Sequence, residues 1–428
     1  MSNSSTTTWE FVTRLHWDDF SYTWQALGFS VGYNGRPAHR ETFLFEVSTF
    51  TDPSEEARLR DILCQSFRLP NDYWESYARR IGRGNFRILR RADRVIDGLA
   101  IYRMGQWFGG KCLNEAGIAA VGIAPEDRSA GAAAHLMTKT LAELYEQGVT
   151  LSALYPSTQR LYRRVGYEQA GSRYQYQLPL TSIGIQERSA PLHRIENVDH
   201  TLYHEVARAR AKATNGNLER NTGMWERIVT YPYGDKAVYR YLIGQPDRPE
   251  GYLFLYQDAE GPGRHQLCVR DMVALSPAAA LSLWTFFSDH RSIADRVLWG
   301  GPAVEPLLML PKELDVQVVA HERWMLRLVD VRKAFCERGY PEGIEGEIHF
   351  EVEDDVLAQN CGKFVLSVAD GVGEVRDGGR GDLKAHVRGI SPLFSGFSSP
   401  TQLRDTGRVE VDDRTVAAAT SIFAGSPP

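Results

Sequence analysis

The stretch Ala119–Ala133 combines residue types that can hold an anion at the start of a helix. It reads Ala-Ala-Val-Gly-Ile-Ala-Pro-Glu-Asp-Arg-Ser-Ala-Gly-Ala-Ala, so an apolar strand pattern runs into an Arg-x-x-Gly turn and then into small residues. The first amides of a helix have no partner within the helix, and the helix dipole adds roughly half a positive charge there. Gly131 lets the backbone approach a phosphate closely, and Arg128 adds a charged donor. An αL glycine that ends an ordinary loop explains the glycine alone equally well.

This arrangement suits a ligand with a diphosphate and an extended, amide-bearing arm. The diphosphate would sit at the turn, and the arm would lie beside the backbone edge of Val121–Ile123, which is how coenzyme A would bind. The position of the turn, between a strand and a helix and after the expected series of elements, favours this interpretation over the ordinary loop.

A second segment, Leu154–Tyr167, places a tyrosine in the middle of a short predicted helix. Pro156 stops the preceding strand, Ser157 can cap the helix, and Gly166 ends it. When an amine attacks a thioester, the leaving thiolate gains charge, and a phenol within about 3 Å of the sulfur can protonate it. From residue type alone, a packing tyrosine with its hydroxyl at the surface is the simpler interpretation of Tyr162. The basic residues around it are equally well a solvated face or an attraction for phosphates.

Hydrophobic periodicity predicts the elements that must position these residues. In the first half of the chain it predicts strands at 42–47, 85–90, 94–104, 117–123 and 149–155, and helices at 54–67, 72–81 and 132–147. A second module repeats this order after Ser189–Pro191, but its turn at Leu275–Pro277 lacks Arg-x-x-Gly, so we expect it to be structural. From about residue 325 a helix and alternating strands predict a small α+β domain. The stretch Asp370–Asp382 has calcium-loop composition, although alternation on both sides favours hairpin turns.

Composition limits the class of protein. The chain has 428 residues, 43% hydrophobic residues and a net charge of −5, which indicates two or three globular domains and gives no support for nucleic-acid binding. No stretch approaches the ~18 apolar residues of a membrane span. The five cysteines are widely spaced without CxxC, so a reducing cytoplasm fits. His200 and His204 stand four apart, but a solvated helix start is the simpler interpretation, and we expect no metal.

Together the motifs resemble a known family. The segments Val121–Gly131 and Ala153–Glu168 look like the enhanced intracellular survival (Eis) branch of the GNAT N-acetyltransferases, and Phe364–Gly371 and Val387–Phe397 look like its sterol-carrier-like domain. The resemblance implies tandem GNAT-type α/β domains, the second degenerate, followed by a sterol-carrier-like α+β domain. We therefore expect an extension at 1–40, a GNAT acetyltransferase domain at 41–188, a degenerate GNAT-like domain at 189–310 and the sterol-carrier-like domain at 311–428.

The resemblance also implies residue roles. Tyr162 would be the general acid on the thiolate, and acetyl-CoA would be bound around Val121, Gly122, Ile123, Arg128, Ser129, Gly131, Ala132 and Ser157. Ser129 stands where the family often has a second arginine, which loosens the diphosphate site. In this family the C-terminal carboxylate acts as the base, which implies Pro428, but the ending 423–428 lacks the family's short aromatic terminus. A water, another carboxylate or a shortened chain are the alternatives.

These observations predict an enzyme that transfers acetyl directly from acetyl-CoA to a primary amine. Some relatives acetylate aminoglycosides and others modify protein lysines, so the expected partner is an amine-bearing small molecule, such as a polyamine, or a lysine side chain. Family members usually form hexamers, and we expect a homo-oligomer. The alternative is a non-catalytic CoA- or lipid-binding protein that uses the sterol-carrier-like domain.

Overall fold

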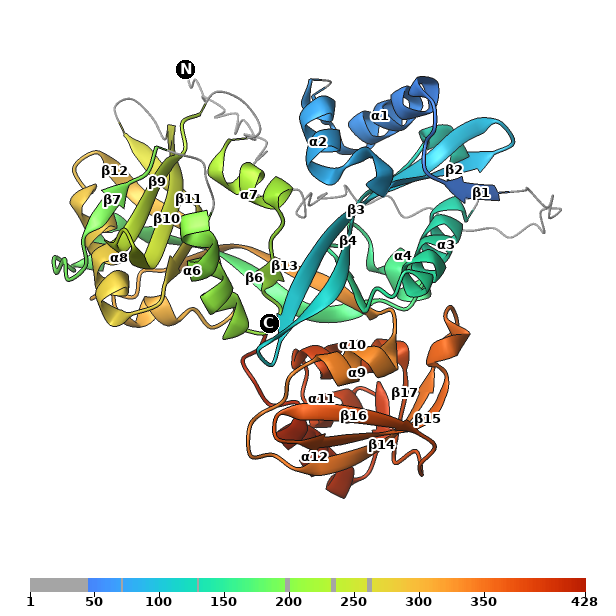
Figure 1. The fold of residues 1–428 in the computed structure, drawn as a ribbon. Helices are drawn as coiled ribbons and strands as arrows, with labels where there is room; N and C mark the ends of the chain where they lie inside the picture. Colours follow the sequence, from blue (N-terminus) through green and yellow to red (C-terminus); the bar gives the residue numbers. More distant parts are fainter. Residues whose placement is uncertain (1–44, 71, 129–130, 197–200, 232–235, 260–263) are drawn as a thin grey trace, which may run out of the picture.

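The computed structural model describes residues 45–70, 72–128, 131–196, 201–231, 236–259 and 264–428. The predicted extension at 1–40 lies outside these residues. Two α/β halves stand side by side on one large sheet, and a separate α+β domain lies against both of them (Figure 1). None of the helices in the described part of the chain is long and apolar enough to cross a membrane.

The first half has the predicted helices and strands. Its elements are β1 (Phe45–Ser48), α1 (Pro53–Phe67), α2 (Tyr73–Ile81), η1 (Arg83–Asn85), β2 (Phe86–Arg91), β3 (Arg94–Phe108), β4 (Lys111–Ile123), η2 (Pro125–Asp127), α3 (Ala132–Glu146), β5 (Leu151–Leu154) and α4 (Gln159–Arg164). Strands β3 and β4 are longer than predicted, and the two short 3-10 helices, η1 and η2, were not predicted. Helix α1 begins where the Asp52 carboxylate accepts hydrogen bonds from the amides of Ser54 and Glu55, with Pro53 at the first helical position. Helix α3 is followed by Gly148, whose φ of 70° is the left-handed conformation expected after a helix end.

The second half repeats this order and adds two long strands at its ends. Its elements are β6 (Glu168–Pro179), α5 (Leu180–Ile183), β7 (Leu192–Arg194), α6 (Thr201–Lys212), β8 (Leu218–Glu219), α7 (Thr222–Val229), β9 (Tyr239–Gln245), β10 (Arg248–Ala259), β11 (His265–Ala274), α8 (Pro277–Asp289), β12 (Ala294–Gly301), η3 (Pro306–Met309) and β13 (Gln317–Leu328).

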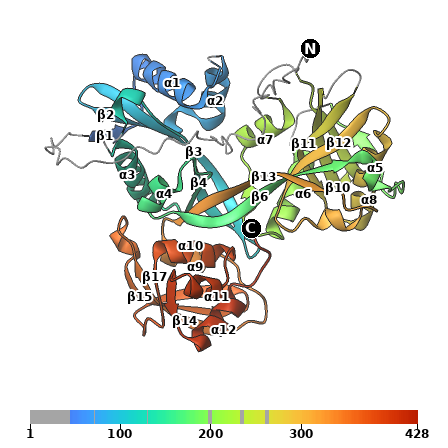
Figure 2. The ribbon, with the colours of Figure 1, turned by 180° about the vertical axis from the view of Figure 1, so that it is seen from behind.

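The two halves exchange strands across the middle of the sheet. Its order is β1-β2-β3-β4-β5-β13-β6-β12-β11-β10-β9-β7, with β8 paired to the edge of β3. Strand β6 leaves the first half and pairs with β12 of the second, while β13 returns and pairs with β5 of the first. Figure 2 shows both strands crossing between the halves. The periodicity did not predict these strands, and the expected boundaries after residues 188 and 310 follow chain order rather than this exchange.

The C-terminal domain packs a second sheet against short helices. Its elements are α9 (Val331–Glu337), β14 (Gly346–Glu353), η4 (Ala358–Asn360), β15 (Gly362–Ala369), β16 (Val372–Asp377), β17 (Leu383–His386), α10 (Val387–Ser395), α11 (Pro400–Asp405), β18 (Val409–Val411) and α12 (Asp413–Ile422). The sheet order is β16-β15-β14-β17-β18. Strands β15 and β16 form a hairpin through Asp370 and Gly371, as alternation predicted for the start of the stretch with calcium-loop composition.

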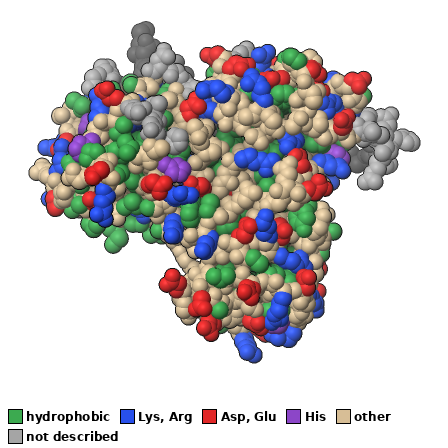
Figure 3. All heavy atoms as spheres, in the orientation of Figure 1, with side chains coloured by type: hydrophobic (Ala, Val, Ile, Leu, Met, Phe, Trp, Pro, Cys, Tyr) green, Lys and Arg blue, Asp and Glu red, His purple; other side chains and the backbone are tan. Residues whose placement is uncertain are grey.

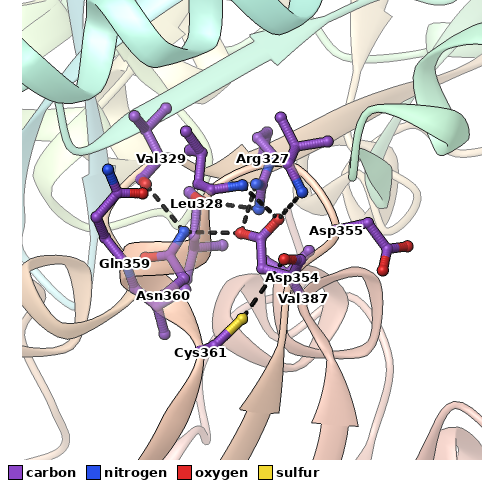
Figure 4. A network of polar contacts seen from close by, with 12 residues as sticks. Arg327, Leu328, Val329, Asp354, Asp355, Gln359, Asn360, Cys361 and Val387 are labelled. Carbon is purple, nitrogen blue, oxygen red and sulfur yellow. Dashed lines mark hydrogen bonds and ion pairs between the residues drawn. The ribbon is translucent and has the colours of Figure 1, made fainter.

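A buried ion pair fixes this domain to the large sheet. The Arg327 guanidinium of β13 lies 2.5 Å from the Asp354 carboxylate, and both side chains are fully buried. Asn360 donates to Asp354 over 2.8 Å and to the Val329 carbonyl over 3.1 Å (Figure 4). Because removing one partner would leave an uncompensated buried charge, this network is expected to hold the domain in one position.

Candidate active site

The site begins where two parallel strands separate. Strands β4 and β5 pair through Glu115–Gly117 and Leu151–Ala153. Beyond Gly117, β4 continues to Ile123, whereas β5 ends at Leu154. The other edge of β4 is paired with β3 throughout, so in the described chain the edge after Gly117 has no strand partner on the β5 side. Backbone donors and acceptors there are open to an extended ligand.

A bulge in β4 shapes this edge. Ala120 has a φ of 51°, and the register with β3 shifts between Gly98 and Ala100. A left-handed alanine costs about 1 kcal/mol or more and re-aims the neighbouring backbone groups. The strain lies at the opening between β4 and β5, where the edge lacks a partner strand.

A pocket lies at the opening between β4 and β5. Its lining comes from the α1–α2 region, from β4 and from the segment after β5: Phe67, Leu69, Tyr73, Tyr77, Ile118, Ala119, Ala120, Val121, Tyr155, Ser157 and Tyr162. The empty volume, open solvent included, is about 620 Å³. Aromatic and aliphatic walls with a few polar groups are typical of a small-molecule site.

Tyr162 is buried on α4 and lines this pocket, so its hydroxyl does not sit on the protein surface. Burial raises the pKa of Tyr162 to about 12, while a hydrogen bond with the Ser157 side chain opposes the rise and the Asp97 carboxylate adds to it. A phenol with this pKa stays protonated at neutral pH and can donate to a developing anion.

The predicted phosphate turn lies at the N-terminus of α3. Gly131 is the N-cap with a φ of 77°, and no side chain caps the helix. A Cβ at Gly131 would meet nothing within 4 Å among the described residues, so the left-handed backbone, rather than crowding by these residues, demands glycine here. Ala132 is buried in the hydrophobic core that also includes Tyr162 and has Val121 packed against it, so the start of α3 belongs to the same core as two residues of the pocket lining. Ser129 lies outside the described residues.

An ion-pair network that the sequence did not reveal holds the turn. The Asp127 carboxylate is buried and contacts Arg91 over 2.8 Å and Arg94 over 2.7 Å. Arg128 next to it is exposed and has no carboxylate within ion-pair distance among the described residues. The network fixes the backbone while Arg128 stays available to an anion.

Other predicted residues have structural explanations. A Cβ at Gly122 would lie 2.7 Å from the Leu63 side chain, so this glycine lets α1 pack on β4. Arg163 donates to Glu168, which also accepts from Arg388 of α10 and thereby links α4 to the C-terminal domain. Ile123 is half-buried at the end of β4.

Pro428 lies at the junction of the three domains. Its carbonyl oxygen accepts a hydrogen bond from the Ser172 amide of β6 over 3.2 Å, and its ring packs on Gly216. Pro428 does not line the pocket around Tyr162.

Of the histidine pair His200 and His204, only His204 can be described, because His200 lies outside the described residues. The His204 ring accepts from the Trp225 indole and contacts the Glu219 carboxylate.

Two buried acids on β3 and β4 were not recognised in the sequence. Asp97 and Glu115 are fully buried. The Glu115 carboxylate oxygens have no hydrogen-bond partner in the described protein, and Asp97 has no side-chain donor there, although the Gly98 amide favours its charged form. Burial raises the pKa of Asp97 well above its usual range and the pKa of Glu115 to about 8. The available signal was an acidic residue inside an otherwise apolar strand pattern.

Comparisons with known proteins identify the domains of this fold. The acetyltransferase (GNAT) domain family matches residues 49–170 and again residues 216–328, and the sterol carrier protein domain matches residues 331–428. An uncharacterized N-acetyltransferase of Streptomyces griseus is 28% identical over 338 residues, covering 73% of this chain and 79% of that protein.

Solved structures extend the comparison to nearly the whole chain. A GCN5-related N-acetyltransferase from Anabaena variabilis is 42% identical with a TM-score of 0.87, covering 90% of this chain and 98% of that one. Eis1 from Mycobacterium abscessus shares the fold at 21% identity, with a TM-score of 0.76 and coverage of 90% and 98%. The chain belongs to the GCN5-related N-acetyltransferase family, with two acetyltransferase domains and a sterol carrier protein domain, and is an N-acetyltransferase that uses acetyl-CoA.

Proposed function

We propose that acetyl-CoA binds in the opening between β4 and β5 of the first half and that Tyr162 assists the transfer of its acetyl group to a primary amine. The observation that carries this proposal is the edge of β4 without a strand partner beside the pocket of Tyr162, after which the chain leads through η2 to the uncapped start of α3. The backbone of Val121, Gly122 and Ile123 would hold the arm. Arg128, Ser129, Gly131 and Ala132 would hold the diphosphate, and Ser157 would lie beside the phenol.

The reaction needs one proton donor and one proton acceptor. The amine nitrogen bonds to the acetyl carbon, the carbon–sulfur bond breaks, and the Tyr162 phenol donates its proton toward the leaving sulfur. Its raised pKa keeps that proton in place at neutral pH. The amine gives up a proton to a base, for which the Pro428 carboxylate, a water or another carboxylate are the candidates.

The expected acceptors are aminoglycoside-like molecules, polyamines or lysine side chains. We also propose a homo-oligomer, and a hexamer in particular. An oligomer is supported by exposed apolar side chains around η3 and the start of β13: Val304, Met309, Leu314 and Val318. Figure 3 shows hydrophobic side chains on the surface of the second half. Light scattering coupled to size exclusion tests the number of subunits. The five free cysteines support the proposed cytoplasmic location.

Replacing Tyr162 with Phe tests the proposed acid. We expect kcat for acetyl transfer to fall about 100-fold, because the thiolate loses its proton donor. The Kd of acetyl-CoA, measured by calorimetry, should change less than about twofold, since the ring keeps its packing. Tyr145→Phe on α3 is the matched control and should leave kcat unchanged.

An unchanged kcat in Tyr162→Phe would show that the phenol is not the acid. The pH profile gives a second check. Because the pKa of Tyr162 is raised to about 12, it cannot account for a loss of wild-type kcat between about pH 7 and pH 9. A loss in that range that disappears in Tyr162→Phe would contradict the assignment.

A further inference from the structure

The inner part of the β3–β4 hairpin contains buried hydrogen-bond acceptors without donors. Glu115 of β4 is fully buried, and Gln106 of β3 is 2% exposed. Both carboxylate oxygens of Glu115 and the Gln106 Oε1 have no hydrogen-bond partner in the described protein. A buried acceptor without a partner costs about 1 to 3 kcal/mol. Because no donor from the described protein reaches Glu115 or the Gln106 oxygen, Glu115 holds its own proton when nothing is bound, and a cation at this place would let it ionise.

The strand register puts these groups on one face of the sheet. Glu115 lies opposite Met104, and Gln106 lies opposite Leu113, so Glu115 and Gln106 are diagonal neighbours on adjacent strands. Such positions are about 7 to 8 Å apart at most, within reach of two long side chains. The Gln106 amide nitrogen donates to the Gly216 carbonyl over 3.0 Å, which leaves its oxygen as the free group.

The same face leads to the acetyl-transfer pocket. Side chains alternate along β4, so Glu115, Gly117 and Ala119 share one face, and Ala119 lines the pocket. From Ala119 to Glu115 the strand covers roughly 13 Å. Between them a Cβ at Gly117 would lie 2.5 Å from the terminal methyl of Met104, so a flexible thioether side chain covers the glycine.

We propose that Glu115 and Gln106 form a subsite for a second ammonium group of a linear polyamine acceptor, whose first amine reacts beside Tyr162. An ammonium brings three donors and a positive charge, which match three acceptor oxygens, two of them on the Glu115 carboxylate. The Met104 side chain lies over Gly117 and would have to move for a ligand to pass, and an unbranched methylene chain asks less displacement of it than a sugar ring does. Two amines roughly 10 Å apart, together with the reach of the Glu115 side chain, would span the roughly 13 Å of strand from Ala119 to Glu115. This inference rests on the proposed function and names its acceptor.

The test compares acceptors that have one or several amines. In Glu115→Gln we expect the KM for spermidine to rise at least about 10-fold, because the charged partner of the second ammonium is lost. The kcat for spermidine, the KM for n-butylamine and the Kd of acetyl-CoA should stay within about twofold, since none of them uses this subsite. Kanamycin, a polyamine built of rings, should also keep its KM. Glu305→Gln, the same change at another partly buried acid in the second half, is the matched control and should leave every value unchanged.

Each other outcome has a distinct meaning. An unchanged spermidine KM overturns the proposal, because it shows that Glu115 keeps its own proton and shares it with Gln106. An equal rise for spermidine and n-butylamine also overturns it, because the effect would then be structural. If the wild type acetylates no amine at all, the proposed function fails instead. Should Glu115→Gln not fold, Gln106→Met removes the acceptor oxygen together with the hydrogen bond to the Gly216 carbonyl. It should raise only the spermidine KM, by about threefold, and no rise there overturns the proposal.

Discussion

The two acetyltransferase halves share one layout but differ at the helix that follows the third long strand. In the first half, α3 starts at Gly131, and no side chain caps it. In the second half, the Ser276 hydroxyl caps α8 by accepting from the Ala279 amide over 3.1 Å, and the Glu250 carboxylate contacts the same hydroxyl. An anion at α8 would meet a satisfied amide and a negative charge. The fold therefore supplies a helix start in both halves, but only the first leaves it open.

The halves also differ in how their openings are filled. In the first, a pocket with Tyr162 remains between β4 and β5. In the second, Trp284 and Trp299 are almost fully buried with ring centroids 5.7 Å apart, and Tyr176 lies 5.3 Å from Trp299. Because large rings occupy the core beside β12, the second half contributes packing and the exchanged strand β13 to the first.

The largest effect should come from closing the open helix start. We expect Gly131→Asp to raise the KM for acetyl-CoA roughly 100-fold, because a carboxylate would stand where the diphosphate binds and like charges a few ångströms apart cost several kcal/mol at an effective dielectric constant of about 20. Aspartate tolerates the left-handed backbone, and a Cβ there has open space. Steady-state kinetics with acetyl-CoA as the varied substrate measure the change.

Gly131→Asn is the matched neutral control. Asparagine has nearly the size of aspartate and the same tolerance of positive φ, so its KM should rise far less. Equal KM values for the two variants would mean that the helix start does not hold an anion, and the contrast between the halves would lose its functional meaning.

The next effect concerns the exchanged strands β6 and β13, which pair with each other between the two halves. A Cβ at Gly171 of β6 would lie 2.2 Å from the Trp324 ring of β13. We expect Gly171→Ala to cost about 1 to 3 kcal/mol of unfolding free energy, because the packed ring has to move. Differential scanning calorimetry should show a melting temperature lower by a few degrees.

Gly84→Ala provides the comparison, because a Cβ there meets nothing within 4 Å and should leave stability within about 0.5 kcal/mol. If the two variants melt together, the exchanged strands tolerate more movement than the close packing of Gly171 and Trp324 implies.

These two sites also show what the sequence could predict. The helix start at Gly131 was predicted because strand, turn glycine and helix stripe are local signals, and the uncapped geometry agrees. Strands β6 and β13 were missed because Gly171 and several charged residues interrupt their alternation. Their stability comes from pairing with strands more than a hundred residues away, as in Val297 with Leu178, which no local pattern reports.

The candidate site also contains residues that the sequence predicted and residues that only the structure revealed. Tyr162 was identified through the resemblance. The structure places it on α4, where it lines the pocket. Asp127 and Glu115 were not found, because the role of each depends on partners, or on missing partners, from other strands. In the sequence, a buried acid cannot be told from an exposed one until the positions of the neighbouring strands are known.

A smaller effect concerns how stability depends on pH, because a buried acid of each half is held in a different charge state. The pKa of Glu115 is raised to about 8, whereas the second half pairs Asp271 with Arg220. A raised pKa means that the folded protein holds the proton more tightly than the unfolded chain. The stability contributed by this proton is therefore complete below about pH 4.5 and is lost as pH rises to about 8. Between about pH 5.5 and pH 8.5, we expect the melting temperature of Glu115→Gln, measured by calorimetry, to fall less than that of the wild type.

Asp271→Asn is the counterpart in the second half, where the ion pair with Arg220 needs the charged form. It should lower stability at both pH values because it leaves the guanidinium without its carboxylate. Parallel pH slopes for Glu115→Gln and the wild type would mean that Glu115 is ionised, and therefore paired, in the folded protein.

The smallest effect tests the closed helix start. Ser276→Ala removes the cap of α8, which should lower the unfolding free energy by about 1 kcal/mol and leave the KM for acetyl-CoA unchanged. The KM stays because Glu250 still places a negative charge at this helix start, so an uncapped amide alone does not create an anion site. The double variant Ser276→Ala with Glu250→Gln removes both obstacles. Calorimetric titration with acetyl-CoA should still find one site per chain, because Trp284 and Trp299 fill the core beside β12; a second site would show that the cap and the charge alone had closed this half.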